Sequence, residues 1–118
     1  MVGLFLIGCS KSPPELMELA QSSLDQNEED KAIRNLDLLI NKYPKDSLAS
    51  LAQYRLVNIY KNWKNDPQMV FMALNKTVEN YPGSVQAKQA GKELDAFPEW
   101  IINKSETLRK RKLTNESI

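Results

Sequence analysis

The sequence predicts an all-α protein built as a short solenoid of about three antiparallel helical hairpins. Apolar residues recur at helical spacing between short polar or proline-containing breaks, and a Tyr-Pro doublet occurs twice with matching residues around it. The chain has 118 residues, of which 42% are apolar and 26% charged, a composition typical of one soluble globular domain. We therefore expect a single folded module.

The first hairpin is expected between Pro14 and Tyr43. Its two apolar faces contain Leu16, Leu19, Ala20, Ser23 and Leu24, and then Ala32, Ile33, Leu36, Leu39 and Ile40. The short polar side chains of residues 25–27 compete with helical hydrogen bonding and favour a tight turn between these faces. The acidic residues at 28–30 suit the positive end of the second helix dipole.

The next helices are separated by proline. Pro44 disfavours helical geometry at Tyr43, and Asp46 or Ser47 can cap a third helix that carries an apolar face up to Tyr60. Asp66 and Pro67 are the expected N-cap and first residue of a fourth helix, which ends at Tyr81-Pro82. A fifth helix follows Gly83 and Ser84 up to about Ala96. Pro98 is expected to open a sixth that carries Trp100, Ile101 and Leu108.

An internal repeat supports this organisation. Aligning Tyr43-Pro44 with Tyr81-Pro82 also aligns Leu36 with Leu74, Ile40 with Val78, Ala49 with Ala87, and Ala52 with Ala90. The offset is constant and close to the tetratricopeptide period of about 34 residues plus a short loop extension.

The chain resembles the tetratricopeptide family in three units. In the first unit the family positions are Leu16, Leu19, Ala20, Ala32, Leu36, Leu39 and Pro44, with Ser23 where the family prefers tyrosine and Leu39 where it prefers alanine. The second unit has Ala52, Tyr54, Leu56, Val57, Tyr60, Leu74 and Pro82, with Val70 and Thr77 in place of alanines. The third keeps Ala87, Ala90 and Leu94. The resemblance implies a right-handed array over residues 15–98, a C-terminal capping helix over 99–113 and a disordered tail over 114–118.

The resemblance also implies a protein-binding function. Solenoids of helical hairpins take peptides on the concave face formed by their first helices. We therefore expect Gln53, Tyr54, Asn58 and Lys61 to lie on the exposed side of that face and to bind a protein partner. The oligomeric state stays open.

Chemistry is not expected. The chain contains no histidine and a single cysteine, which excludes Ser-His-Asp and Cys-His nucleophiles, His/Cys zinc sites and an intramolecular disulfide. We expect no catalytic residue, no metal and no cofactor.

The N-terminus carries a different motif. Residues 1–8 are apolar, too few to span a bilayer, and Leu6-Ile7-Gly8-Cys9 resembles the bacterial lipobox. The resemblance implies a signal segment over 1–8, a diacylglycerol on Cys9, and a tether over 9–14 whose Ser10 suits outer-membrane sorting. No lysine or arginine precedes Cys9. An apolar segment packed on a soluble cytoplasmic adaptor, with Cys9 as a small buried hydrophobe, is the alternative.

The two Tyr-Pro doublets and Ala52-x-Tyr54-x-Leu56 resemble the repeats of BamD-like and TolA-binding-like lipoproteins of the bacterial envelope. This resemblance implies an outer-membrane lipoprotein that faces the periplasm and holds another envelope protein. The chain is too short for the five repeats of BamD.

The charges add a further hypothesis. The net charge is +1, so the chain lacks the strongly basic character of a nucleic-acid-binding domain. Between Glu15 and Asp37 the acidic residues outnumber the basic ones, whereas Arg109 to Lys112 form a basic stretch. We favour solvated helix faces for both, and keep binding of the basic stretch to nucleic acid or anionic lipid as a third hypothesis.

Overall fold

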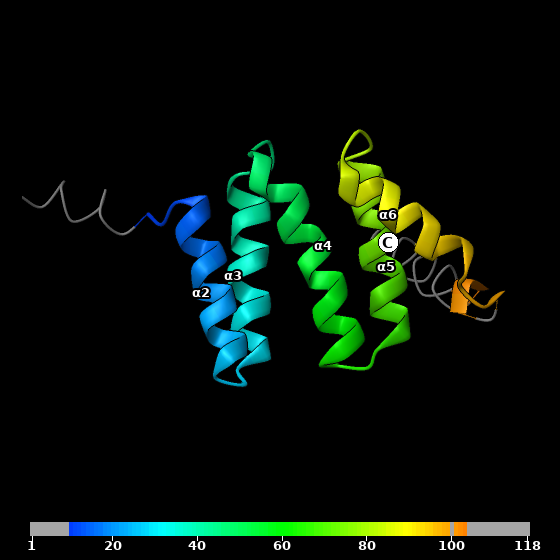
Figure 1. Ribbon diagram of the computed structural model, residues 1–118, viewed down its shortest axis with the longest axis horizontal. Coiled ribbons are helices and arrows are strands. Elements are labelled where there is room, and N and C mark those ends of the chain that lie inside the picture. Colours follow the sequence, from blue (N-terminus) through cyan, green and yellow to red (C-terminus); the bar gives the residue numbers. More distant parts are fainter. Residues whose placement is uncertain (1–9, 100, 104–118) are drawn as a thin grey trace, which may run out of the picture.

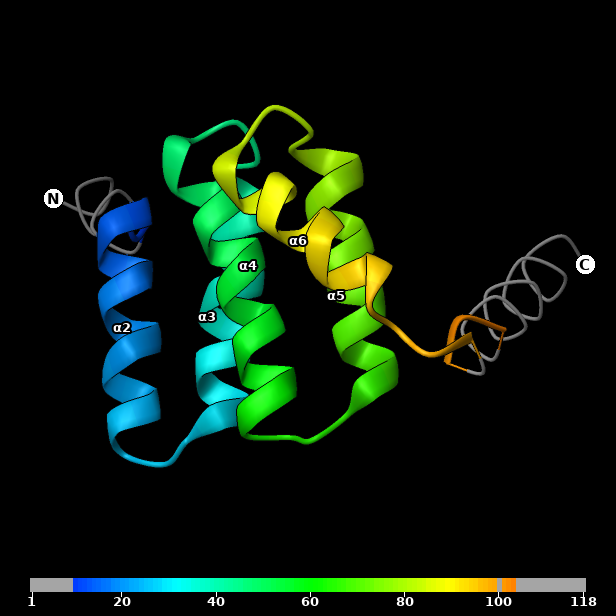
Figure 2. The ribbon, with the colours of Figure 1, turned by 45° about the vertical axis from the view of Figure 1, so that its right-hand side comes forward.

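The computed structural model describes residues 10–99 and 101–103. Its helices are α2 (Pro13–Asp25), α3 (Glu29–Lys42), α4 (Ser47–Asn62), α5 (Pro67–Asn80) and α6 (Val85–Asp95), and the described residues contain no strand. Successive helices run up and down side by side (Figure 1). α2 pairs with α3 and α4 with α5, while α6 packs on α5 and also touches α4 (Figure 2). The predicted all-α array of helical hairpins is confirmed.

Local sequence determines where these helices begin. Ser12 and Glu15 form a capping box, in which the Glu15 N–H donates to Ser12 Oγ over 3.4 Å and the Ser12 N–H donates to Glu15 Oε1 over 3.3 Å. The carboxylates of Asp46 and Asp66 accept from the Leu48 and Met69 N–H groups at 2.8 and 3.2 Å. These caps satisfy backbone donors that have no partner within the helix.

The turn that joins the two helices of each hairpin contains an asparagine in an unusual backbone conformation. Asn27 and Asn65 have φ angles of 61° and 50°, the left-handed region, which asparagine tolerates better than most residues. Asn27 stands in the polar segment that predicts the first turn. Asn65 immediately precedes the cap of α5, so both hairpins close with the same residue type.

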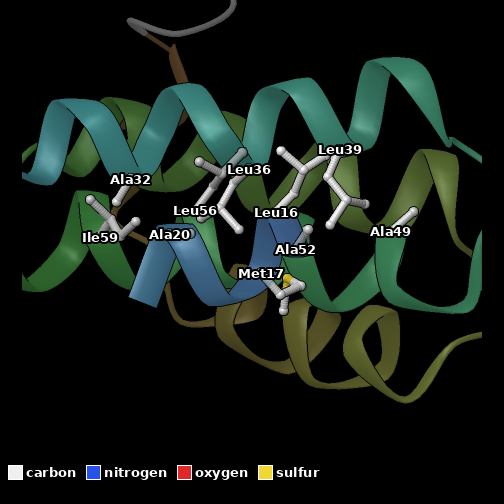
Figure 3. Packing of buried hydrophobic residues seen from close by; sticks show 10 residues of the cluster. All are labelled: Leu16, Met17, Ala20, Ala32, Leu36, Leu39, Ala49, Ala52, Leu56 and Ile59. Atoms are coloured by element: carbon white, nitrogen blue, oxygen red, sulfur yellow. The ribbon is translucent and has the colours of Figure 1, made fainter. Parts of the chain in front are cut away.

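Two clusters of buried side chains hold the helices together. The larger joins α2, α3 and α4 (Figure 3) and consists of Leu16, Met17, Ala20, Ala32, Leu36, Leu39, Ala49, Ala52, Leu56 and Ile59. The smaller joins α4, α5 and α6 and consists of Val57, Val70, Ala73, Leu74 and Ala90. Each fully buried leucine contributes about 2 kcal/mol of hydrophobic free energy. The alanines allow the helix backbones to approach closely.

Polar residues that depart from the repeat pattern are satisfied within their own helices. Ser23 is 4% exposed, and its hydroxyl donates to the Leu19 carbonyl over 2.8 Å. Thr77 is fully buried and donates to the Ala73 carbonyl over 2.8 Å. A buried hydroxyl without such a bond would cost about 1–3 kcal/mol. The substitutions are therefore compatible with a well-packed core.

The expected tether over residues 9–14 needs correction. Pro13 and Pro14 form the first turn of α2, since a proline there loses no helical hydrogen bond. Ser10 Oγ accepts from Lys42 Nζ over 3.1 Å, and the Lys11 carbonyl accepts from the Tyr43 hydroxyl over 2.8 Å. Residues 10–14 are thus attached to the end of α3. Cys9 and the expected signal segment 1–8 lie outside the described residues.

After α6 the chain turns and becomes helical again. The N–H groups of Ile101 and Ile102 donate to the Pro98 carbonyl, and Ile101 is 4% exposed. Residues 101–103 therefore agree with an element opened by Pro98. The expected positions of Trp100 and Leu108, and residues 104–118 of the capping helix and tail, are outside the described part. Among the described helices, none is both long and apolar enough to cross a membrane.

Candidate functional site

The four residues expected to bind a partner all belong to α4, but the structure does not bring them together. α4 is the central helix and contacts α2, α3, α5 and α6. Its sides therefore face different neighbours. Gln53 faces α5, Tyr54 and Lys61 face α6, and Asn58 faces α2.

The expectation that Gln53 is exposed is wrong. Its side chain is 3% exposed, and its amide Nε2 donates to the Ala73 carbonyl of α5 over 3.5 Å. The residues beside it along α4, Leu56 and Val57, are also buried. This side of α4 is covered because α5 folds back on it, and Gln53 keeps its polar group satisfied by bonding to the α5 backbone.

Tyr54 and Lys61 converge on one carboxylate of α6. The Tyr54 hydroxyl donates to Glu93 Oε2, and Lys61 Nζ lies 2.5 Å from Glu93 Oε1. Burial raises the pKa of Tyr54 to about 12, and the hydrogen bond to Glu93 adds to this effect. Burial opposes ionisation of Glu93, but the hydrogen bonds from Lys61 and Tyr54 outweigh it and lower the pKa of Glu93. This trio connects α4 to α6.

Asn58 lies in a groove between the first helices of the two hairpins. We call it the α2–α4 groove. Its volume is about 260 Å³, and it is lined by Gln21, Leu24, Arg55, Asn58, Ile59, Asn62 and Trp63. Within the described part of the chain, no side-chain hydrogen bond or ion pair occupies Arg55, Asn58 or Asn62. Trp63 is 39% exposed. The groove therefore offers a cation, two amides and an aromatic surface.

Sequence reasoning missed most of this groove. Arg55, Ile59 and Asn62 follow one another at helical spacing on the same side of α4 as Asn58. That spacing is visible in the sequence. Trp63 ends α4 as its C-cap and stays partly exposed.

A second groove opens on the opposite side, between the second helices of the hairpins. This α3–α5 groove has a volume of about 360 Å³ and contains Asp37, Ile40, Asn41, Gln53, Leu56, Tyr60, Met69, Met72, Ala73, Lys76 and Asn80. Burial raises the pKa of Asp37, while the charge of Lys76 lowers it in part. The groove has an apolar floor of packed core residues.

Neither groove contains a cluster of metal ligands among the described residues. Across residues 10–99 and 101–103, no three acidic, cysteine or histidine side chains lie close enough to hold a metal ion. The perturbed groups around Glu93 form contacts between helices and face neither groove. The geometry suits recognition of a peptide segment.

Comparison with protein families identifies the first hairpin. Residues 16–46 match the family model of the tetratricopeptide repeat, which agrees with the unit assigned from Leu16 to Pro44. Comparison with curated proteins and with solved structures gave no significant match. Repeats of this family form protein-interaction scaffolds. Residues 16–46, which include most of α2 and all of α3, therefore match a tetratricopeptide repeat, and this match supports a role in protein–protein interaction.

Proposed function

We propose that this protein is a scaffold of the bacterial envelope that holds another envelope protein in its α2–α4 groove and is anchored by a lipid on Cys9. The groove supports the binding role, because it lies between the first helices of adjacent repeats and presents side chains without partners in the described structure. The anchor rests on the sequence motif that precedes residue 10.

The groove residues define the chemistry of the bound segment. Leu24, Ile59 and Trp63 form its apolar surface, which suits an aliphatic or aromatic side chain. Arg55 provides planar donors for a carboxylate, and the amides of Asn58 and Asn62 can pair with a peptide backbone. We therefore propose a peptide segment that combines an apolar residue with an acidic one.

Site-specific photo-crosslinking tests the groove. A photoreactive amino acid in place of Asn58 is expected to capture a discrete partner from envelope fractions. The matched control places the same amino acid at Lys88, which is exposed on α6 and does not line the groove. The same adducts from both positions, or none from position 58, would reject the groove as the binding site.

The lipid anchor is supported by the sequence and by the course of the chain. Leu6-Ile7-Gly8-Cys9 resembles a lipobox, and Ser10 and Lys11, which follow it, are exposed. A lipid on Cys9 would therefore extend from the surface of the fold. Together with the Tyr-Pro repeats, which resemble those of BamD-like lipoproteins, this supports a location at the periplasmic face of the outer membrane.

Fractionation tests the anchor. In a Gram-negative host the protein is expected in the outer-membrane fraction, and the Cys9→Ala variant or treatment with globomycin should release it or trap its precursor. The anchor would be refuted if the protein were found in the soluble fraction in all three cases: the wild type, the wild type after globomycin treatment, and the Cys9→Ala variant. The soluble cytoplasmic adaptor, with the same groove, would then be the better description.

A further inference from the structure

The turns of the array lie at two opposite edges, and the edges differ in character. The N-terminus of α2 and both Tyr-Pro turns lie at one end of the helices (Figures 1 and 2). We call this the anchor edge and define it as residues 10–13, 42–47 and 80–85. The distal edge, at the other end, consists of the two hairpin turns at 25–29 and 62–67.

Their charges are opposite. The anchor edge contains three lysines, Lys11, Lys42 and Lys45, and one acid, Asp46, whose carboxylate caps α4. The distal edge contains four acids, Asp25, Glu28, Glu29 and Asp66, and one lysine, Lys64, which pairs with Asp30 and Glu29. Near the anchor edge, Glu15 belongs to the Ser12 capping box, and Glu79 lies one residue before the edge.

The anchor edge also exposes an apolar residue. Val85, the first residue of α6, is 79% exposed, the largest value among the exposed large hydrophobic residues of the described chain. It follows Pro82 and Gly83, which are exposed as well. The anchor edge thus combines three lysines with an exposed aliphatic side chain at another point along it, and lysines together with an exposed apolar residue favour contact with an anionic lipid surface.

We propose that the anchor edge rests on a phospholipid surface, with the helices projecting from it and the acidic distal edge pointing away. This rests on the proposed lipid at Cys9. Ser10 and Lys11, directly after Cys9, are bound to Lys42 and Tyr43, so little free chain separates the anchor from this edge. The lysines approach the headgroups, Val85 inserts between them, and the acids of the distal edge are repelled from the anionic surface.

This orientation has a consequence for partner binding. α4 begins at Ser47 on the anchor edge and ends at Asn62 on the distal edge. The groove residues Arg55, Asn58, Asn62 and Trp63 therefore lie in its distal half, away from the lipid surface. A partner in the periplasm can reach the α2–α4 groove while the anchor edge stays on the membrane.

Tryptophan quenching tests the orientation. The full chain is coupled through the Cys9 thiol to maleimide-bearing lipid in vesicles of phosphatidylethanolamine and phosphatidylglycerol with brominated acyl chains. One reporter is Val85→Trp with Trp63→Phe and Trp100→Phe, and the other retains Trp63 with Trp100→Phe. Val85 is largely exposed, so its replacement leaves the core intact. We expect quenching of the tryptophan at 85 and none of Trp63. Quenching of Trp63, or of neither reporter, would overturn the proposal.

Charge variants test the lysines separately. Lys11→Glu with Lys45→Glu is expected to abolish quenching of the tryptophan at position 85, whereas Lys31→Glu with Lys92→Glu, an equal change of charge away from the anchor edge, should preserve it. Unchanged quenching in the first variant would refute the role of the basic edge. Because the attachment is chemical, these results do not depend on lipidation in cells, and a negative fractionation result would leave them interpretable.

Discussion

Tyr43 and Tyr81 occupy the same structural position in successive hairpins. Each is the C-cap of a second helix, with φ and ψ of −128° and 57° at Tyr43 and −132° and 54° at Tyr81. Their carbonyls accept from the N–H groups of Asp46 and Ser84 at 3.1 and 3.0 Å. The proline after each tyrosine excludes a further helical turn, and the residue two positions later caps the next helix. The Tyr-Pro repeat is therefore a repeated helix–helix connection.

This repeated connection predicts equal sensitivity to loss of its caps. Asp46→Ala and Ser84→Ala each remove the side chain that accepts from the first turn of the next helix, at 2.8 and 3.0 Å. We expect each to lower the free energy of unfolding by about 1 kcal/mol, measured by urea denaturation. Asp46→Asn, which retains an accepting oxygen, is the control and should change little. Equal losses for alanine and asparagine would rule out the capping role.

Leu36 and Leu74 predict equivalent packing defects. Both are fully buried at matching repeat positions, Leu36 in the larger cluster and Leu74 in the smaller. Replacement of either by alanine is expected to destabilise the fold by about 3 kcal/mol, because it removes buried methyl groups and leaves a cavity. Chemical denaturation measures the loss. Leu38→Ala, at a leucine that is 47% exposed, should have a much smaller effect. A similar loss at Leu38 would contradict the assigned core.

The contacts of Glu93 predict a pH dependence of stability. Tyr54 has a folded-state pKa of about 12 against an ordinary value of 10.0. Its contribution to the free energy of unfolding is therefore fully present below pH 10 and is lost as the pH rises from 10.0 to about 12. The pKa of Glu93 is lowered from its ordinary value of 4.5. Its contribution to the free energy of unfolding is therefore present above pH 4.5 and is lost as the pH falls through the lower pKa of the folded state.

Absorbance titration of tyrosinate tests the raised pKa of Tyr54, on which the alkaline part of this pH dependence rests. The wild type is expected to contain a tyrosine that ionises near pH 12, and Tyr54→Phe should remove that step. Glu93→Gln should shift the step toward lower pH, since the negative partner disappears. Burial also raises the pKa of Tyr60 and Tyr81, so Tyr60→Phe and Tyr81→Phe are the controls and should retain the step near pH 12. Loss of that step in one of these controls, together with its survival in Tyr54→Phe, would assign it to another tyrosine and contradict the effect of the contact between α4 and α6.

The groove predicts a small set of energetically dominant residues. Once the partner segment is known from cross-linking, Arg55→Ala or Trp63→Ala is expected to weaken its binding by about 2 kcal/mol, roughly thirtyfold in Kd, as buried arginine and tryptophan contacts do. Calorimetry with the partner peptide measures the loss. Met72→Ala, at a 41% exposed residue of the α3–α5 groove, is the control. A loss at Met72 with none at Arg55 would move the binding site to that face.

The sequence by itself determined the local structure and the repeat. Helix ends follow from residues close to one another along the chain, as at Ser12 and Glu15 or at Asp66 and Pro67, so capping rules predict them. The buried faces follow from periodicity, which places Leu16 and Leu36 on the apolar faces of their helices, and both are fully buried in the structure. The match to the tetratricopeptide repeat covers residues 16–46, a range that includes Leu16 and Leu36.

Only the tertiary structure decided how the sides of α4 are used. Gln53 and Tyr54 are adjacent in sequence, yet Gln53 packs against α5 and Tyr54 bonds to Glu93 of α6. Which side of a central helix is covered depends on how its neighbours cross it, and those neighbours come from distant parts of the chain. Periodicity identifies an apolar face but cannot tell which polar residues beside it remain exposed. The α2–α4 groove, with Asn58 and Arg55 together, exists because two helices from different hairpins lie side by side.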